Sequence, residues 1–302
     1  MKIGIDLGGS HIGVGVIEEN KIILSKERNF DREDREDFKA SIIKYIDILI
    51  NDLLDELNLN ISQIELIGIA SPGTVSNGII KKASNLKLEN FNLTEILKEK
   101  YNIPIIIRND AKAAALAEKK YGSMKDFDDC VFLTIGTGIG GAAFVDGKLL
   151  EPKRFSGFEF GHMILNKDGR LCSCGKKGCF ETYASIRALK MQVTKDLDID
   201  SDITGQYLRE KLLIKNDPVI KDDVEMFLDY LKTGICNLID IFEPEVVCLG
   251  GSFAYYENNP ILDKLLEKID EDSATFNNEN KPKIVLADFK NDAGIIGATI
   301  RN

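Results

Sequence analysis

The sequence lacks the features of membrane, secreted and nucleic-acid-binding proteins. It contains no apolar run long enough to cross a bilayer and no low-complexity segment. Its 39 basic residues are outnumbered by 49 acidic ones, and the net charge of −10 disfavours binding to phosphate backbones and to anionic membranes. The N-terminal stretch MKIGIDLGGS enters a strand pattern at once, which leaves no room for a signal peptide. These absences predict a cytoplasmic protein with reduced cysteines and neither a nucleic-acid nor a membrane partner.

One common nucleotide-binding motif and one redox motif are missing, and a second nucleotide-binding motif is present in the wrong context. No G-x-x-x-x-G-K-[S/T] sequence occurs, which excludes a Walker A loop. Gly136, Gly138 and Gly141 do match G-x-G-x-x-G, but the alternating residues that follow predict a strand, where a dinucleotide-binding fold needs a helix. The absence of a C-x-x-C pair disfavours thioredoxin-like chemistry.

The residues that are present predict a compact α/β protein. A chain of 302 residues with 44% hydrophobic and 29% charged residues is large enough for two domains. Two hairpins with glycine turns, beginning near residues 2 and 129, indicate duplication of one supersecondary unit. Apolar periodicity predicts strands at 2–27, 64–73, 129–150 and 245–253 and helices at 37–57, 181–197, 203–213 and 217–242. It also predicts a strand at 103–107 followed by a helix that ends at Gly122, and a strand with a closing helix at 282–300.

Three strands run into glycine turns: IDLGGS at 5–10, TIGTGIGG at 134–141 and CLGGS at 248–252. Glycine lets backbone N–H groups approach an anion closely, and Ser10, Thr134 and Thr137 add hydroxyls. Ordinary hairpins also end in glycine pairs, but three such turns in one chain favour a nucleotide cradle. Phosphates held by hairpin turns on two duplicated halves predict an actin-like ATPase. Asp6 then lies where Mg²⁺ needs a carboxylate, although a turn-capping aspartate is an equally open interpretation.

A cluster of soft side chains follows the second hairpin. Cys172, Cys174 and Cys179 form C-x-C-x₄-C, and His162 stands ten residues earlier. Three thiolates and one imidazole complete a tetrahedral zinc shell with no open position, which predicts a structural ion. An odd number of cysteines in a reducing compartment disfavours a disulfide there. The remaining cysteines lie in apolar runs and are expected in the core: Cys130, Cys236 and Cys248.

Five segments together resemble the ROK family of bacterial sugar kinases: IDLGGS, RNDAKAAALAE, TIGTGIGGA, GFEFGHM and CSCGKKGCFE. They follow the family order over nearly the whole chain, and the last is similar to its C-x-C-G-x-x-G-C-x-E zinc motif. The resemblance implies an α/β, actin-like ATPase (ribonuclease H-like, duplicated) two-domain fold with a cleft between the domains. Residues 1–117 plus 290–302 would form the smaller N-terminal domain, and 118–289 the larger domain with the zinc site.

The resemblance also implies an activity. It is that of a glucokinase-like enzyme that transfers the γ-phosphate of ATP to the 6-hydroxyl of a hexose, with ATP, Mg²⁺ and structural Zn²⁺ as cofactors and a homodimer as the assembly. Some members of the family are instead transcriptional repressors with an N-terminal helix-turn-helix. This sequence starts at the first phosphate strand, so that DNA-binding half is not expected.

Site residues carry over from the family motifs position by position. Asp110 matches the catalytic aspartate, and its place between a buried strand and a helix N-terminus suits a general base. His162 is expected to serve twice, with one ring nitrogen on zinc and the other towards the sugar. The implied sugar contacts are Ser71, Gly73, Asn85, Asn109, Asp110, Glu159, His162 and Glu181. The implied nucleotide contacts are Asp6, Gly8, Gly9, Ser10, Thr137 and Gly138, with Gly250 and Gly251 near the adenosine.

One position departs from the family pattern. Phe158 stands where the family usually has glycine, directly before Glu159. A bulky side chain there is expected to reshape the pocket near the 2-position of the sugar. N-acetylmannosamine, N-acetylglucosamine and fructose therefore stay open as alternatives to glucose. A non-catalytic, sugar-sensing relative is the alternative of another class.

Overall fold

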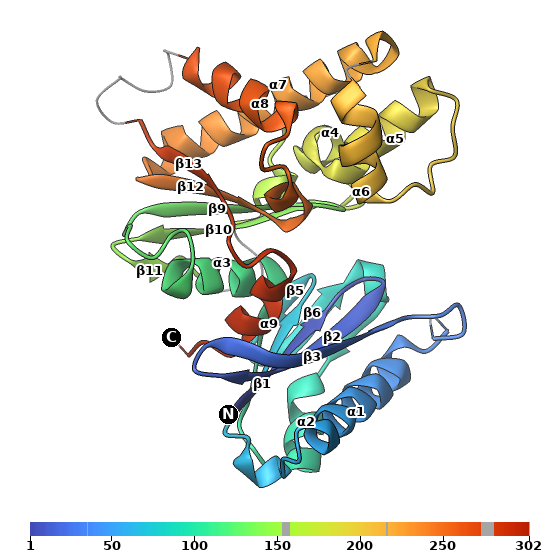
Figure 1. Ribbon diagram of the computed structural model, residues 1–302, viewed down its shortest axis with the longest axis vertical. Helices are drawn as coiled ribbons and strands as arrows, with labels where there is room; N and C mark the ends of the chain where they lie inside the picture. The colour runs from blue at the N-terminus through green and yellow to red at the C-terminus, as the bar shows by residue number, and fades with distance from the viewer. Residues whose placement is uncertain (35, 153–157, 216, 273–280, 302) are drawn as a thin grey trace. The chain divides into compact units, whose positions relative to one another are not determined.

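The structure is a computed structural model that describes residues 1–34, 36–152, 158–215, 217–272 and 281–301 (Figure 1). The chain forms two compact units. Unit 1 comprises the described residues of Met1–Gly122, Glu151–Gly157 and Asn291–Asn302, and unit 2 those of Ser123–Leu150 and Phe158–Lys290. Within the described part of the chain, no helix has the length and apolar content needed to cross a membrane.

Unit 1 is built on a five-stranded sheet of order β3-β2-β1-β4-β8. The strands are β1 (Lys2–Leu7), β2 (His11–Glu18), β3 (Lys21–Asn29), β4 (Ile67–Ser71) and β8 (Ile105–Asn109). The first three form the antiparallel meander expected from their alternating sequence, and β4 and β8 continue the sheet in parallel with β1. Because the register pairs Asp6 with Ala70 and Ser71 with Asn109, the carboxyl ends of β1, β4 and β8 meet at one edge.

Helices cover both faces of this sheet (Figure 1). They are α1 (Phe38–Glu56) and α2 (Leu93–Tyr101) on one face, and α3 (Asp110–Tyr121) and α9 (Ala293–Ala298) on the other. Glycines allow α9 to lie directly on the strands: a Cβ on Gly4 would stand 2.0 Å from the carbonyl oxygen of Ile295, and one on Gly68 2.1 Å from that of Ala298. A second sheet of β5 (Thr74–Ser76), β6 (Ile79–Ala83) and β7 (Leu88–Phe91) was not expected from the sequence.

Unit 2 repeats the strand order of unit 1. Its sheet runs β11-β10-β9-β12-β13, with an antiparallel meander followed by two parallel strands. The strands are β9 (Cys130–Ile135), β10 (Ile139–Val145), β11 (Lys148–Leu149), β12 (Val246–Gly250) and β13 (Lys283–Leu286). The duplication expected from the two glycine-turn hairpins is therefore confirmed.

The helices of unit 2 differ in part from expectation. They are α4 (Glu181–Ala184), α5 (Ile186–Asp196), α6 (Gly205–Tyr207), α7 (Lys221–Phe242) and α8 (Pro260–Asp270). The helix expected at 181–197 is broken at Ser185, whose backbone is extended and whose side chain accepts from the backbone N–H of Ala188 at 3.0 Å. Ser185 is thus an N-cap that ends one helix and begins the next. The segment expected as a helix at 203–213 is one α turn followed by a π turn over Leu208–Leu212.

Candidate active site and metal centre

The Asn109–Asp110 pair marks the junction of β8 and α3. Asn109 is the N-cap of α3, and its Oδ1 accepts from the backbone N–H of Lys112 at 3.2 Å. Asp110 is the first residue of the helix, and its Oδ1 accepts from the Nδ2 of Asn109 at 2.9 Å and from the backbone N–H of Ala111 at 2.8 Å. These donors and the positive end of the helix dipole favour an ionised carboxylate. The expected strand-to-helix junction at Asp110 is present.

The turn after β4 lies against this pair. The side chain of Asn109 donates to the carbonyl of Gly73 at 3.1 Å. Gly73 has a φ of +79°, and a Cβ there would stand 2.1 Å from the carbonyl oxygen of Lys82, so only glycine fits. Ser71 is fully buried, and its hydroxyl donates to the carbonyl of Pro72 at 3.2 Å. Unit 1 therefore brings together sugar contacts that were predicted from separate segments, namely Ser71, Gly73 and the Asn109–Asp110 pair.

The turn between β1 and β2 carries the other predicted residues of unit 1. The backbone N–H of Gly8 donates to the carbonyl of His11 at 2.9 Å and closes the turn. A Cβ on Gly9 would stand 2.8 Å from the Nδ2 of Asn85, which places Asn85 beside this turn. Asp6, at the end of β1, contacts Gly294 of α9 closely enough that a Cβ there would be 2.7 Å from its carboxylate.

Burial raises the pKa of Asp6 from 3.8 to about 6. Between about pH 4 and pH 6 the folded chain keeps a proton that the unfolded chain has lost, so the free energy of unfolding falls as the pH rises through this interval. The Asp6→Asn variant has no carboxyl group to ionise at this position, so this fall in the free energy of unfolding does not occur in it. The variant is expected to gain up to about 3 kcal/mol over the wild type at pH 7 and little at pH 4. Urea unfolding of both proteins from pH 4 to pH 8 measures the difference, and a difference independent of pH would contradict the assignment.

Two glycine turns lie side by side in unit 2. The register of β9 and β12 pairs Thr134 with Gly250, so the turns that follow the two strands share one edge. Gly251 has a φ of +64°, and a Cβ there would stand 2.6 Å from the Oγ1 of Thr134. In the turn after β9, the backbone N–H of Gly136 donates to the carbonyl of Gly138 at 2.9 Å. The two turns, with the hydroxyl of Thr134 against Gly251, thus lie together where phosphates were predicted.

A pocket of about 440 Å³ opens beside these turns, lined by Gly136, Thr137 and Ser252 together with Arg187 and Lys190 of α5. The two basic residues were missed by the sequence reasoning. They stand at i and i+3 on one helix, a spacing that puts both on one face, and this signal could have found them. A cationic wall next to an N–H-rich turn is suited to an anionic ligand.

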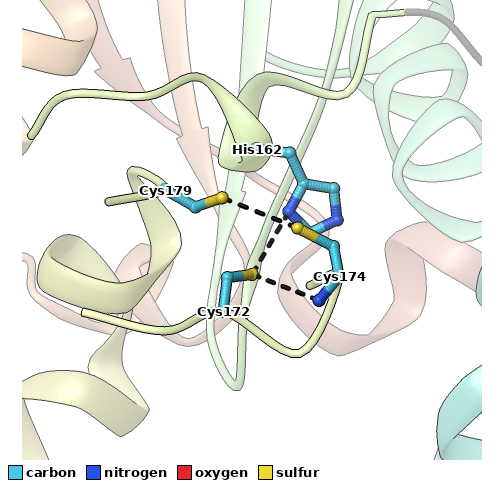
Figure 2. Close-up of side chains that lie close together, drawn as sticks. All are labelled: His162, Cys172, Cys174 and Cys179. Carbon is cyan, nitrogen blue, oxygen red and sulfur yellow. Dashed lines mark hydrogen bonds between the residues drawn. The ribbon is translucent and has the colours of Figure 1, made fainter. Parts of the chain in front are cut away.

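The cysteines and His162 converge as predicted (Figure 2). The Sγ of Cys172 lies 3.7 Å from the Nδ1 of His162, and the Sγ atoms of Cys174 and Cys179 are 3.6 Å apart. All four ligand atoms lie within 4.8 Å of one another. Ligands at about 2.3 Å from a tetrahedral zinc ion are about 3.8 Å apart, so the group has the size and donor chemistry that Zn²⁺ requires.

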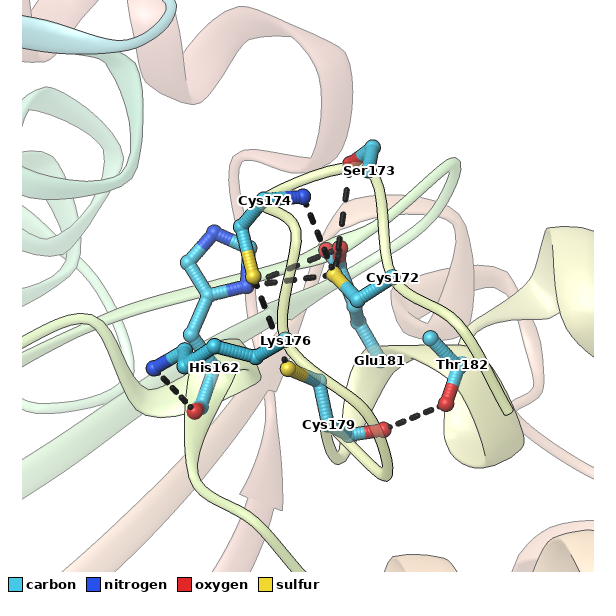
Figure 3. Close-up of polar contacts among 8 residues, drawn as sticks. All are labelled: His162, Cys172, Ser173, Cys174, Lys176, Cys179, Glu181 and Thr182. Atoms are coloured by element: carbon cyan, nitrogen blue, oxygen red, sulfur yellow. Dashed lines mark hydrogen bonds and ion pairs between the residues drawn. The ribbon is translucent and has the colours of Figure 1, made fainter. Parts of the chain in front are cut away.

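The loop that carries the thiols is held in shape by its glycines and by one lysine. Gly175 and Gly178 have φ values of +89° and +77°, and a Cβ on Gly178 would stand 1.6 Å from the carbonyl oxygen of Asn166. Lys176 donates to the carbonyl of His162 at 3.0 Å (Figure 3). Burial raises the pKa of the Cys172 thiol to about 12, so a thiolate at this position needs a compensating cation.

The two predicted sugar-binding carboxylates of unit 2 are placed differently. Glu181 begins α4 and points to the cluster, where its Oε1 accepts from the Sγ of Cys172 at 3.1 Å and lies 3.7 Å from the Nδ1 of His162 (Figure 3). Glu159 is exposed, and its carbonyl accepts from the backbone N–H of His162 at 3.0 Å. Because Nδ1 faces the sulfurs, Nε2 is the nitrogen of His162 left for another partner (Figure 2).

Phe158 has a left-handed backbone, with a φ of +60°. A bulky L-residue pays about 1–3 kcal/mol for this conformation, which glycine adopts freely. Its ring is partly buried against the hydrophobic core of unit 2. The side chain therefore anchors the backbone immediately before Glu159 in a conformation that it would not otherwise favour.

Three kinds of comparison relate the chain to known proteins. The family model described as "ROK family" matches residues 2–301. The chain is 30% identical to a xylose repressor of Caldicellulosiruptor bescii, a match that covers 98% of this chain and 76% of the repressor.

Solved structures match over nearly the full length. A ROK family glucokinase from Streptomyces griseus, crystallised with glucose and AMPPNP, superposes with a TM-score of 0.80 at 27% identity, over 98% of this chain and 97% of that one. A Listeria monocytogenes protein named as a candidate N-acetylmannosamine kinase gives a TM-score of 0.79 at 29% identity, over 99% and 97% of the two chains. The actin-like ATPase fold predicted from the glycine turns is thereby confirmed.

Proposed function

Because the chain belongs to the ROK family, we propose that it is an ATP-dependent kinase that phosphorylates the 6-hydroxyl of a glucose-like hexose. The observation that carries the proposal is the carboxylate of Asp110 at the first position of α3, held by Asn109 and by a backbone N–H. Asp110 accepts the proton of the 6-hydroxyl as that oxygen bonds to the γ-phosphorus and the bond to the β-phosphate oxygen breaks, with ADP leaving. The glucose and AMPPNP bound by the Streptomyces griseus relative support this choice of substrates.

The sugar's remaining hydroxyls need donors and acceptors at fixed positions. Asn109, already oriented by its bonds to Gly73 and Lys112, offers an amide to the ring hydroxyls. Glu159, Glu181 and the Nε2 of His162 offer two carboxylates and an imidazole, a set suited to a polyol. Asn85, Ser71 and Gly73 shape the turns of unit 1 in the proposed pocket wall.

The nucleotide is assigned to the glycine turns. The proposed phosphate contacts are Gly8, Gly9 and Ser10 within unit 1 and Thr137 and Gly138 within unit 2, which offer glycine backbone and hydroxyl groups. The turn of Gly250 and Gly251 lies next to the adenosine, and Arg187 and Lys190 add positive charge. Asp6 is the proposed carboxylate for Mg²⁺, and a divalent cation would offset the burial that raises its pKa.

The four-residue cluster is the proposed site of a structural Zn²⁺. Its donor set of three thiolates and one imidazole is complete, so the ion would cross-link the loop and open no position to substrate. His162, Cys172, Cys174 and Cys179 hold the ion. With the ion bound, His162 would keep one ring tautomer and Glu181 one position.

An ADP-release assay over a panel of hexoses tests the proposal. Glucose, mannose, fructose, N-acetylmannosamine and N-acetylglucosamine are each supplied with MgATP, and the product is analysed for the position of the phosphate. We expect the highest kcat/KM with a glucose-like hexose and a 6-phosphate product. Absence of ADP release with every sugar, from protein that contains its metal, would overturn the kinase assignment.

Phe158→Gly is expected to change sugar selectivity. Glycine removes the cost of the left-handed backbone and the ring's anchorage on the core, so the chain before Glu159 gains freedom. We expect the ratio of kcat/KM for glucose over N-acetylmannosamine to shift by about 10-fold, the scale of one altered pocket contact. Leu150→Ala, which trims another side chain packed on the same core, is the control. An unchanged ratio in a folded Phe158→Gly protein would exclude a role in selectivity.

The second candidate is a non-catalytic sugar sensor, favoured by the 30% identity to a xylose repressor. The Asn109–Asp110 pair and the glycine turns argue for the kinase, because a sensor has no need of a base beside phosphate turns. Calorimetry with sugars separates the two. Tight sugar binding without ADP release would favour the sensor.

A further inference from the structure

Unit 2 contains a second pocket, of about 420 Å³, besides the first one of about 440 Å³ that was assigned to the nucleotide. Its walls come from the loop that carries the thiols, from α4 and from α5, and Thr137 of the turn after β9 completes them. The volume lies within the range of small-molecule sites. The proposed sugar and nucleotide contacts account for only part of this wall.

The charge of the second pocket is positive. Arg170, Arg187 and Lys195 line it, and among the described lining residues Glu181 is the one carboxylate, with its Oε2 so near the turn that a Cβ on Gly138 would be 2.7 Å away. Within the part of the chain that the structure describes, the side chains of Arg187 and Lys195 pair with no acidic residue. Two unpaired cations beside one pocket, in a chain with a net charge of −10, are suited to an anionic ligand.

Arg170 is held in place at the wall of this pocket by neutral groups. Its Nη1 donates to the carbonyl of Thr182 at 3.0 Å, and its Nη2 donates to the Oε1 of Gln192 at 3.3 Å. The guanidinium carbon lies 4.7 Å from the centre of the Tyr183 ring. A cation that is already ordered loses less conformational entropy when it binds an anion.

One face of α5 joins the two pockets. Arg187, Met191 and Lys195 stand at i, i+4 and i+8, so they form a row about 12 Å long on one side of the helix. Arg187 and Met191 line both pockets, as does Thr137. Lys190 lines only the first pocket and Lys195 only the second. The pockets are therefore neighbours that share the guanidinium of Arg187.

The uncharged part of the wall indicates the class of ligand. Leu171 and Met191 are 73% and 55% exposed and offer aliphatic surface. No described lining residue is aromatic, so a nucleobase would find no ring to stack on. Hydroxyl groups are plentiful instead, from Thr137, Ser173, Thr182 and Ser185. Hydroxyls and aliphatic carbons suit the edge and the C–H face of a sugar ring, and the cations suit a phosphate.

We propose that the second pocket binds a phosphorylated sugar, and that this ligand opposes nucleotide binding because both draw on Arg187. The proposal rests on the proposed function for the identity of the nucleotide pocket and for the product, a hexose 6-phosphate, as one ligand of this class. A phosphate bound by Lys195 and Arg187 takes the guanidinium away from the phosphates of the nucleotide. The coupling is reciprocal, so the nucleotide weakens the sugar phosphate by the same factor.

Calorimetry without nucleotide tests the site itself. Glucose 6-phosphate is titrated into the full-length protein in excess glucose, which fills the proposed sugar site, and inorganic phosphate is titrated separately. We expect the 6-phosphate to bind at least about 10-fold more tightly than phosphate, and Lys195→Ala to raise its Kd about 10-fold. Equal affinity for the two anions would overturn the sugar as part of the ligand, and an unchanged Kd in Lys195→Ala would overturn the site.

Lys190→Ala is the matched control, because it removes a lysine from the same helix and from the first pocket alone. We expect it to weaken MgAMPPNP and to keep the wild-type Kd of glucose 6-phosphate. Lys195→Ala is expected to do the reverse, with the Kd of MgAMPPNP within about twofold of the wild type. Loss of both affinities in either lysine variant would contradict the division into two pockets.

The competition is measured as the ratio of the Kd values of MgAMPPNP with and without saturating glucose 6-phosphate, again in excess glucose. We expect a ratio of about 5 in the wild type and about 1 in Arg187→Ala. A wild-type ratio of 1 overturns the coupling. A wild-type protein that binds no nucleotide contradicts the proposed function instead, and the binding of glucose 6-phosphate at Lys195 is still measured independently of it.

Discussion

Replacement of Asp110 by asparagine is expected to lower kcat by about 1000-fold or more and to leave the Kd of the sugar within about threefold of the wild-type value. The amide has nearly the same shape, and its oxygen can still accept from the Nδ2 of Asn109 and the N–H of Ala111. It cannot take up the proton of the attacking hydroxyl. The interaction that is lost is therefore one made only in the transition state, which affects kcat and kcat/KM equally.

Single-turnover kinetics with MgATP and calorimetry with the sugar alone test these two parts. Asp37→Asn is the matched control, because Asp37 is also an aspartate at a helix start, where its Oδ1 accepts from the N–H of Ala40 at 3.1 Å. It lies at α1, outside the proposed site, and is expected to keep the wild-type kcat. A near-normal kcat in Asp110→Asn would remove Asp110 from its role as the base.

The features of the site that could be predicted from the sequence are those encoded by a local pattern of residues. A buried strand followed directly by a helix-forming run placed Asn109 and Asp110 at a junction, and α3 does begin at Asp110. The donor set of the metal centre could be predicted, because three thiols and an imidazole stand within 18 positions with glycines between them. The similar hairpins that begin near residues 2 and 129 predicted a duplicated unit, and the two sheets do share one strand order. Both hairpins carry the same alternation of apolar residues and a glycine turn.

The features that could not be predicted depend on contacts between distant segments. The small sheet of β5, β6 and β7 consists of strands of three to five residues, too short for a clear alternation. The break at Ser185 is set by one extended residue in an otherwise helical pattern. Nothing near Glu181 in the sequence points to Gly138, because 43 residues separate them and only tertiary packing brings α4 beside the turn after β9. The left-handed Phe158 is equally invisible, since packing on the core overrides its backbone preference.

Cys174→Ser is expected to abolish stable metal binding and to raise the KM for the sugar by at least about 10-fold, with loss of thermal stability in unit 2. Serine is a far poorer zinc ligand than a thiolate, so the cluster keeps three donors where a closed shell needs four. Cys174 is exposed, so the loss of stability cannot come from a core cavity and must come from the released loop. His162 and Glu181 lose their common anchor with that loop, and both are proposed sugar contacts.

Metal content per chain, thermal unfolding and sugar titration are measured on the same preparation, together with Cys236→Ala. Cys236 is a buried thiol on α7, outside the four-residue cluster, so its removal is expected to cost packing energy and to keep both the metal and the KM. Comparison of Cys174→Ser with Cys236→Ala separates the metal-binding role of cysteine in this chain from its role in core packing. If Cys174→Ser retains one metal ion per chain and a wild-type KM, the cluster is not the element that holds His162 and Glu181 in place. Sugar affinity would then have to come from unit 1, chiefly from Asn109 and the turn that it binds.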